Sequence, residues 1–263
     1  MTGQAHPCAQ SSLALVHHSL SHKGDRSYNE DAYCHVRDKH VVSFAVADGM
    51  GGAAGGAQAS HLAMQAVRAA VLTLDPEQFS AQLRAMSQRI QDEQQSNPRL
   101  RQMSTTVVEL RIDTYAQKAV WAHWGDSRMY WFRATELMAM TVDHSVVQSL
   151  VSAGLLSAQE ARSYPQKNVL LGAVGANSEV GPDVLAAPVD VASGDAFLLC
   201  TDGIWNCLAP EDIEASLKKS GSVQAWVSDL MDQVERVGQG SNDNFTATGV
   251  WITSDGEQTL LLR

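Results

Sequence analysis

The 263-residue sequence has few cysteines, no long apolar run and no excess of basic residues. Its four cysteines include no C-x-x-C pair, and its nine histidines show no H-E-x-x-H or other metal-binding spacing, so the sequence predicts no zinc site. The even number of cysteines leaves disulfides open, although free thiols in a cytosolic chain fit better. No stretch approaches the roughly 20 apolar residues of a membrane span, and the N-terminus lacks the basic and apolar regions of a signal peptide. We therefore expect a soluble, cytoplasmic protein.

The low content of basic residues and two missing motifs exclude some classes of partner and some types of reaction. The formal net charge of -10 argues against nucleic acid and anionic membranes as partners, because both attract a basic face. No cysteine is followed six positions later by arginine, which argues against a cysteine-nucleophile phosphatase. No G-x-x-x-x-G-K-[ST] loop is present, which argues against a nucleoside triphosphatase. The sequence also has no internal repeat and no linker, so residues 1–263 are expected to form a single domain.

Apolar patterns predict strands and helices along the whole chain. Strands are predicted at 13–20, 32–36, 41–47, 105–112, 119–124, 128–132, 136–141, 196–201, 248–253 and 258–262. Helices are predicted at 57–74, 76–95, 145–153, 210–219 and 223–237, with a capping box at 157–160 opening a short one. A flap is expected at about 145–183, where the part from 157 onward is weakly periodic. This order is not a regular βαβ alternation and indicates an α+β layer fold with antiparallel sheets covered by helices.

What the sequence does contain is a series of five short acidic motifs spread over more than 200 residues. They are Arg26-Ser27-Tyr28-Asn29-Glu30-Asp31, Asp48-Gly49-Met50-Gly51-Gly52, Gly125-Asp126-Ser127-Arg128, Thr201-Asp202-Gly203 and Asn242-Asp243-Asn244. Taken singly, an Asp-Gly pair usually marks a plain turn. Most of these aspartates, however, follow or lie between strand-like runs, where a carboxylate is costly unless a positive charge meets it. Together the motifs favour a shared pocket for divalent cations.

The three most widely separated aspartates suggest the chemistry of that pocket. Asp48, Asp202 and Asp243 together with water and one carbonyl can complete the coordination of two Mg²⁺ or Mn²⁺ ions, since hard cations prefer oxygen ligands. A carboxylate that bridges two such ions holds them about 3.5–4 Å apart, the spacing of two-metal sites that cleave phosphate esters. A water between the ions would attack the phosphorus in line.

The residues beside these aspartates have two possible interpretations. The planar fork of Arg26 suits two phosphate oxygens, although a lone arginine in this position is often a solvated loop residue. Glu30 and Asp31 could accept hydrogen bonds from metal-bound waters, or could form a surface acidic pair. His144 borders the predicted flap and could contact substrate, whereas His123 lies within a predicted strand and is expected to be a packed or surface residue.

In this order, the motifs resemble those of the metal-dependent type 2C serine/threonine protein phosphatases, particularly the compact bacterial members, from about residue 13 to residue 262. The resemblance implies a β-sandwich of two antiparallel sheets flanked on both sides by helix pairs, with a small flap insertion. It implies hydrolysis of phosphoserine and phosphothreonine in phosphorylated proteins by a metal-bridging hydroxide, without a phosphoenzyme. A monomer opposed by a Hanks-type serine/threonine kinase is the expected biological setting.

The resemblance also assigns a role to each motif residue. Asp48 would bridge two Mn²⁺ or Mg²⁺ ions, the carbonyl of Gly49 would bind one of them, and Asp202 and Asp243 would bind the other. A second group has supporting roles: Glu30 and Asp31 hold metal waters, Arg26 binds the substrate phosphate, and Asp126 joins Asp202 at a third, weaker ion.

The sequence departs from the family pattern at three places. Met50 stands where many eukaryotic members have a histidine that is the suggested general acid, so water would protonate the leaving oxygen. Leu171 and Gly172 occupy flap positions that usually hold Thr-Arg, and Ser104 replaces glycine in a Gly-Thr-Thr strand start.

Alternative functions stay open at this stage. A phosphoprotein-binding pseudophosphatase would lack one of Asp48, Asp202 and Asp243, and all three are present. A hydrolase of small phosphoesters or of another phosphorylated residue, and a phosphatase dedicated to a secretion system or to sporulation, remain compatible with the sequence.

Overall fold

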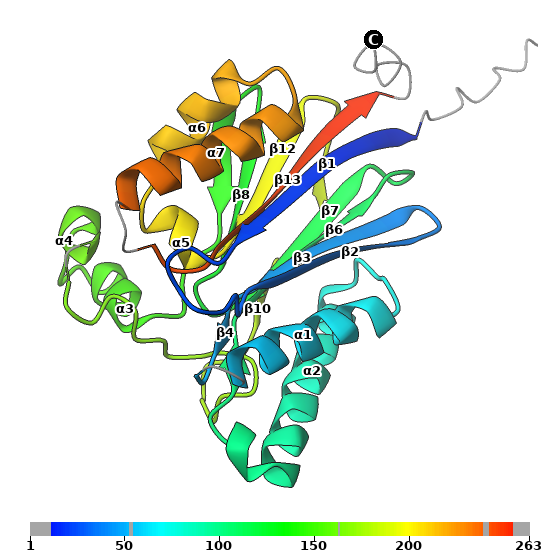
Figure 1. The fold of residues 1–263 in the computed structure, drawn as a ribbon. Coiled ribbons are helices and arrows are strands. Elements are labelled where there is room, and N and C mark those ends of the chain that lie inside the picture. Colours follow the sequence, from blue (N-terminus) through cyan, green and yellow to red (C-terminus); the bar gives the residue numbers. More distant parts are fainter. Residues whose placement is uncertain (1–11, 53–54, 163, 239–241, 255–263) are drawn as a thin grey trace, which may run out of the picture.

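The computed structural model describes residues 12–52, 55–162, 164–238 and 242–254, and within them two antiparallel sheets face each other (Figure 1). The first sheet has the spatial order β1 (Leu13–His22), β13 (Phe245–Ser254), β12 (Asp195–Cys200), β8 (Arg128–Arg133), β9 (Glu136–Met140). The second has the order β10 (Asp183–Val184), β7 (Lys118–Trp124), β6 (Val107–Asp113), β3 (Val41–Ala47), β2 (Ala32–Asp38), and β11 (Val189–Asp190) also pairs with β7. β4 (Gly49–Met50) and β5 (Ser104–Thr105) form a separate short ribbon.

A helix pair covers the outer face of each sheet (Figure 1). α1 (Gly55–Ala69) and α2 (Pro76–Ser96) pack on the second sheet, and α6 (Pro210–Lys219) and α7 (Val223–Gly238) pack on the first. The shorter helices are η1 (Pro98–Leu100), α3 (Val146–Ser152), α4 (Ala158–Arg162) and α5 (Asp202–Trp205). The predicted α+β sandwich with flanking helix pairs is therefore confirmed.

Three layers of apolar side chains hold this arrangement together. On β3, Val42, Phe44 and Val46 face the other sheet, whereas Ala45 and Ala47 face α1 and α2, as the two-residue period of a strand requires. Both faces of β3 are therefore buried, which is why its sequence is apolar except for Ser43. Trp226 of α7 is fully buried against the outer face of the first sheet.

Some predicted boundaries were wrong. The helix predicted at 57–74 begins at Gly55 and ends at Ala69, and Val71, which the prediction placed inside it, is 72% exposed. The chain then turns because Asp75 caps α2, where its Oδ1 accepts a hydrogen bond from Gln78 N at 2.8 Å. β10 and β11, of two residues each, were not predicted, and the strand predicted at 258–262 lies outside the described residues.

The flap and the acidic motifs lie at one end of the sandwich. The region predicted as a flap contains α3 and α4, which project beside α5 in Figure 1 and lead through irregular chain to β10. The register of β12 and β13 pairs Cys200 with Ala247, so the end of β12 and the start of β13 meet at the same edge of the sheet. Asp48 follows β3 in the other sheet. None of the helices in the described part of the chain is both long and apolar enough to span a membrane.

Candidate metal and phosphate site

The ends of these strands enclose a polar pocket of about 240 Å³. Seven of its lining residues were predicted from the sequence: Arg26, Glu30, Asp48, Gly49, Asp126, Asp202 and Asp243. Met50, Asn168, Leu170 and Asn244 complete the lining. Asp31 does not line the pocket, but it lies close enough to raise the pKa of Asp48. The structure therefore brings together residues that are up to 218 positions apart.

Two threonines fix the backbone that carries Asp48. The Asp48 N–H donates to Thr106 Oγ1 at 3.0 Å, and the Asp48 carbonyl accepts from Thr106 N and from Thr105 Oγ1, both at 2.8 Å. Thr106 Oγ1 also shares a hydrogen bond of 2.6 Å with Ser127 Oγ, beside Asp126. The sequence identified residues 103–106 only as the start of a strand. The structure shows that Thr105 and Thr106 also hold the backbone of Asp48.

Glycines allow α1 to approach the pocket closely. The N–H of Gly49 donates to the carbonyl of Glu30 at 3.2 Å. A Cβ on Gly49 would lie 2.1 Å from the carbonyl oxygen of Gly56, and a Cβ on Gly56 would lie 2.4 Å from Glu30 Oε1. Any larger side chain at either position would therefore collide with the site. Glu30 Oε1 is buried here without a hydrogen-bond partner.

Asp31 lies deep between the two sheets and is only 6% exposed. Its Oδ2 accepts hydrogen bonds from Thr201 Oγ1 at 2.9 Å and from Thr246 Oγ1 at 2.7 Å, while Oδ1 is buried without a partner. Burial raises the pKa of Asp31 to about 7, against the lowering effect of the two threonine hydroxyls. One oxygen of Asp31 is thus held firmly and the other is left unsatisfied.

Asp202 shows the same division between its two oxygens. Its Oδ2 accepts from Asn206 Nδ2 at 3.1 Å, and Oδ1 is buried without a partner. Asn206 Oδ1 in turn accepts from Lys167 Nζ of the flap region at 3.1 Å. Burial, followed by the nearby charge of Asp243, raises the pKa of Asp202 to about 6. Asn206 therefore orients Asp202 and connects it to the flap.

Asp243 and Arg26 meet at the outer rim of the pocket. Arg26 Nη2 lies 2.7 Å from Asp243 Oδ2, and the side chains are 62% and 43% exposed. The neighbouring Asn244 accepts from Glu30 N at 2.8 Å and donates to the carbonyls of Lys23 and Tyr28, also at 2.8 Å. Asn244 therefore holds the Arg26–Glu30 loop against Asp243, a role for which the sequence gave no specific signal.

Asp126 is carried by the turn between β7 and β8, where the chain passes from one sheet to the other. Its carbonyl accepts from Trp205 Nε1 at 2.8 Å. The Trp205 ring lies 3.8 Å from the guanidinium of Arg128, which makes two hydrogen bonds of 2.7 and 2.8 Å with Asp143. Burial, followed by the charge of Asp202, raises the pKa of Asp126 well above its usual value.

The electrostatics of the pocket fit a set of divalent cations. Burial, and then Asp31, raises the pKa of Asp48 well above its usual value, so four crowded carboxylates resist carrying their charges together. Three of the oxygens at this site are buried without partners: Glu30 Oε1, Asp31 Oδ1 and Asp202 Oδ1. An oxygen-only donor set suits Mg²⁺ or Mn²⁺. The residues present therefore fit these ions.

His144 lies away from the pocket lining. It is 8% exposed, its backbone N–H donates to the carbonyl of Gly125 at 3.0 Å, and its Nε2 lies 3.2 Å from Asp183 Oδ2. Leu171, one of the two flap residues that depart from the family pattern, donates its backbone N–H to the His144 carbonyl at 2.8 Å. This part of the flap is therefore bonded to His144. The predicted contact of His144 with substrate stays a prediction.

Sequence and structure comparisons place these residues in a known family. A sequence model described as Protein phosphatase 2C matches residues 20–245. Protein phosphatase PhpP of Streptococcus pneumoniae is 34% identical over 196 residues, which cover 72% of this chain and 78% of the relative. The Mycobacterium tuberculosis serine/threonine phosphatase PstP/Ppp superposes with a TM-score of 0.79 at 29% identity, covering 91% and 99% of the two chains. The PstP catalytic domain in complex with two manganese ions has the same TM-score and identity, covering 92% and 100%.

Proposed function

Because the chain belongs to the protein phosphatase 2C family, it is a metal-dependent serine/threonine protein phosphatase, and we propose that the acidic pocket is its catalytic centre. The observation that supports this most directly is the meeting of unpartnered, buried carboxylate oxygens with the guanidinium of Arg26. Such an arrangement offers oxygen ligands for cations and a positive fork for a phosphoryl group in the same pocket of about 240 Å³.

We propose the following roles for the ligands. Asp48 would be shared by two Mn²⁺ or Mg²⁺ ions, the Gly49 carbonyl would help to hold one of them, and Asp202 and Asp243 would help to hold the other. When bound, the ions polarise the phosphoryl oxygens and lower the pKa of an attacking water. Asp126 and Asp202 would share a third ion, since both carboxylates line the same pocket and each is buried.

The remaining residues position the substrate and the water. Glu30 and Asp31 accept hydrogen bonds from waters through the oxygens that protein groups leave free. Arg26 binds the phosphate of phosphoserine or phosphothreonine and holds it for in-line displacement. Met50 lines the pocket but has no acidic proton, so the leaving serine or threonine oxygen takes its proton from water.

The substrates we propose are phosphorylated proteins, and the opposing enzyme we propose is a Hanks-type serine/threonine kinase. The flap supports selection among substrates because its Asn168 and Leu170 reach the pocket lining. A panel of phosphoserine, phosphothreonine and phosphotyrosine peptides beside p-nitrophenyl phosphate tests the assignment. Turnover of the aryl ester without turnover of the first two peptides would instead favour a hydrolase of small phosphoesters.

The catalytic site is tested by Asp48→Asn, which keeps the shape of the side chain and removes its charge. We expect no measurable turnover of p-nitrophenyl phosphate in Mn²⁺, with an unchanged circular dichroism spectrum. Asp38→Asn, an exposed aspartate at the far end of β2, is the matched control and should keep the activity of the parent chain. Unchanged turnover in Asp48→Asn would refute the assignment.

A further inference from the structure

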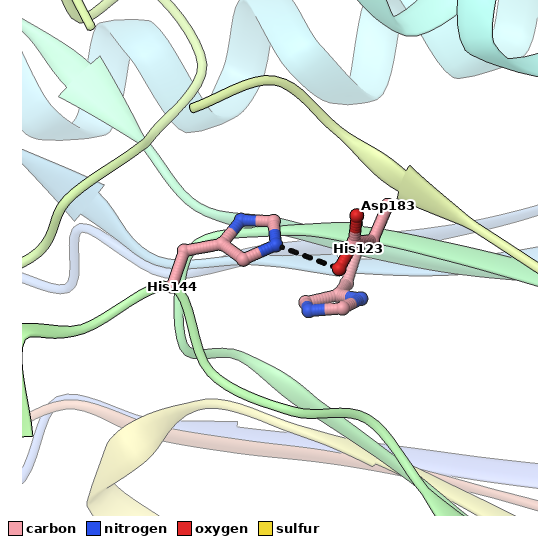
Figure 2. Close-up of side chains that lie close together, drawn as sticks. All are labelled: His123, His144 and Asp183. Carbon is pink, nitrogen blue, oxygen red and sulfur yellow. Dashed lines mark ion pairs between the residues drawn. The ribbon is translucent and has the colours of Figure 1, made fainter. Parts of the chain in front are cut away.

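Two buried histidines and an aspartate meet outside the acidic pocket (Figure 2). His123 lies on β7, His144 follows β9, and Asp183 begins β10, where it stands directly opposite His123 in the antiparallel register. The two imidazole rings stack with centroids 4.5 Å apart, and His144 Nε2 lies 3.2 Å from Asp183 Oδ2. One ligand atom from each residue lies within 4.8 Å of the others. None of the three lines the acidic pocket.

The hydrogen bond of His123 leaves one ring nitrogen free to bind an ion. His123 Nε2 lies 2.7 Å from the carbonyl oxygen of Val142, and a carbonyl can only accept, so Nε2 carries the proton. The lone pair of Nδ1 is then available on a ring that is only 4% exposed. A histidine that donates one N–H to a backbone carbonyl while the other nitrogen binds metal is the usual arrangement at metal sites. Burial also lowers the pKa of His123, which favours the neutral ring.

His144 has one ring nitrogen, Nε2, beside the carboxylate of Asp183. Its Nδ1 lies 3.3 Å from Gly125 N, so in the absence of an ion Nε2 carries the proton and donates it to Asp183. A cation between His144 and Asp183 binds Nε2 in place of that proton. The imidazole stays neutral, and its single proton then lies on Nδ1. Gly125 N–H consequently loses its hydrogen bond of 3.3 Å to His144.

From this geometry we propose that His123, His144 and Asp183 bind one divalent cation of the zinc class, such as Zn²⁺, Co²⁺ or Ni²⁺. Two imidazoles and one carboxylate suit these borderline metals better than Mg²⁺, which prefers oxygen ligands. Asp183 is 71% exposed, so the ion reaches the site from solvent and keeps at least one water ligand. To bind an ion, the three ligand atoms, which lie within 4.8 Å of one another, must draw closer together, and Asp183 has the most exposed side chain of the three. This site is independent of the proposed catalytic function.

Isothermal titration calorimetry of the full chain with ZnCl₂ tests this site. A large excess of Mg²⁺ is present to occupy the carboxylate oxygens of the acidic pocket. We expect one Zn²⁺ whose affinity falls at least about 100-fold in Asp183→Asn, because loss of a direct ligand exceeds the 10–100-fold cost of losing a second-shell partner. Asp183 is exposed, so this variant should fold normally. His61→Asn removes an exposed histidine of α1 and should titrate like the parent chain.

Two outcomes would overturn the proposal. One is an identical Zn²⁺ isotherm for the parent chain and Asp183→Asn. The other is an anomalous diffraction map at the zinc edge that shows the ion only in the acidic pocket and no peak between His123 and His144. His123→Asn provides a second test, and a Zn²⁺ affinity equal to that of the parent chain would also contradict the assignment.

Discussion

Replacement of Gly56 by alanine should damage the metal site although the residue is not a ligand. A Cβ at this position would lie 2.6 Å from the carbonyl oxygen of Gly49, whereas real Cβ contacts stay at or above 3.0 Å, so the oxygen must move by about 0.4 Å. Metal–ligand distances are tolerated within about 0.2 Å. The displacement therefore removes the Gly49 carbonyl as a ligand, and the contact of 2.4 Å with Glu30 Oε1 displaces a second group.

The effect on stability should be much smaller than the effect on metal binding. Alanine in a helix is favoured over glycine by at most about 1 kcal/mol, which offsets part of the strain from the new contacts. We expect the apparent dissociation constant for Mn²⁺, from titration of p-nitrophenyl phosphate hydrolysis, to rise by about 10–100-fold. The free energy of unfolding in chelator should change by no more than about 1 kcal/mol.

Gly55→Ala is the matched control in the same helical turn. Its Cβ would come closest to Met103 Cβ, at 3.2 Å, which a shift of a few tenths of an ångström relieves, and the backbone of Met103 lies at an ordinary contact distance of 3.6 Å or more. Gly55→Ala should keep the Mn²⁺ titration of the parent chain. If Gly56→Ala also kept it, the argument that α1 sets the position of the Gly49 carbonyl would be wrong.

Three further predictions test the core, the electrostatics and the orientation of a ligand. Arg111→Met removes the cation paired with Glu109 at 1% exposure and leaves this carboxyl group the hydroxyl of Ser43, so the free energy of unfolding in urea should fall by about 3–5 kcal/mol, and a loss under about 1 kcal/mol would contradict this. The pKa values of Asp31, about 7, and Asp202, about 6, exceed the unfolded value of about 3.9, so the folded chain binds more protons between these limits. Stability in chelator, measured by thermal unfolding, should therefore fall as pH rises from about 4 to 7, and Mn²⁺ should restore it at pH 8; a rising midpoint in chelator would contradict the sign. Asn206→Ala frees Asp202 Oδ2 and should raise the Mn²⁺ requirement for activity by about 10–100-fold, and an unchanged titration would rule out the orienting role.

The sequence predicted the acidic pocket well because several of its carboxylates follow buried strands. Asp48 directly follows β3, and Asp202 is the second residue after β12, so strand-like runs followed by Asp-Gly located both of them. The layer order followed from the alternation of strand blocks with helix pairs. By contrast, the end of α1 was misplaced, because local periodicity continued to Val71 although the chain had already turned toward α2.

Residues that hold the site through long-range contacts gave no local signal. Thr201 and Thr246 both bond Asp31, yet they lie 170 and 215 positions from it. The pairing of His123 with Asp183 depends on the register of β7 and β10, and a two-residue strand is too short to be detected by periodicity. The sequence therefore showed no histidine set, and the cluster became visible only in three dimensions.

The ten-residue pairing of β1 with β13 has a consequence for synthesis of the protein. Asp243 and Asn244 immediately precede β13, so a nascent or truncated chain that stops before residue 242 has Asp48 and Arg26 but lacks the opposite wall of the pocket. β1 also cannot form its pairing with β13 until residues 245–254 have left the ribosome. We therefore expect an incomplete chain to have no phosphatase activity until residues 242–254 have been made.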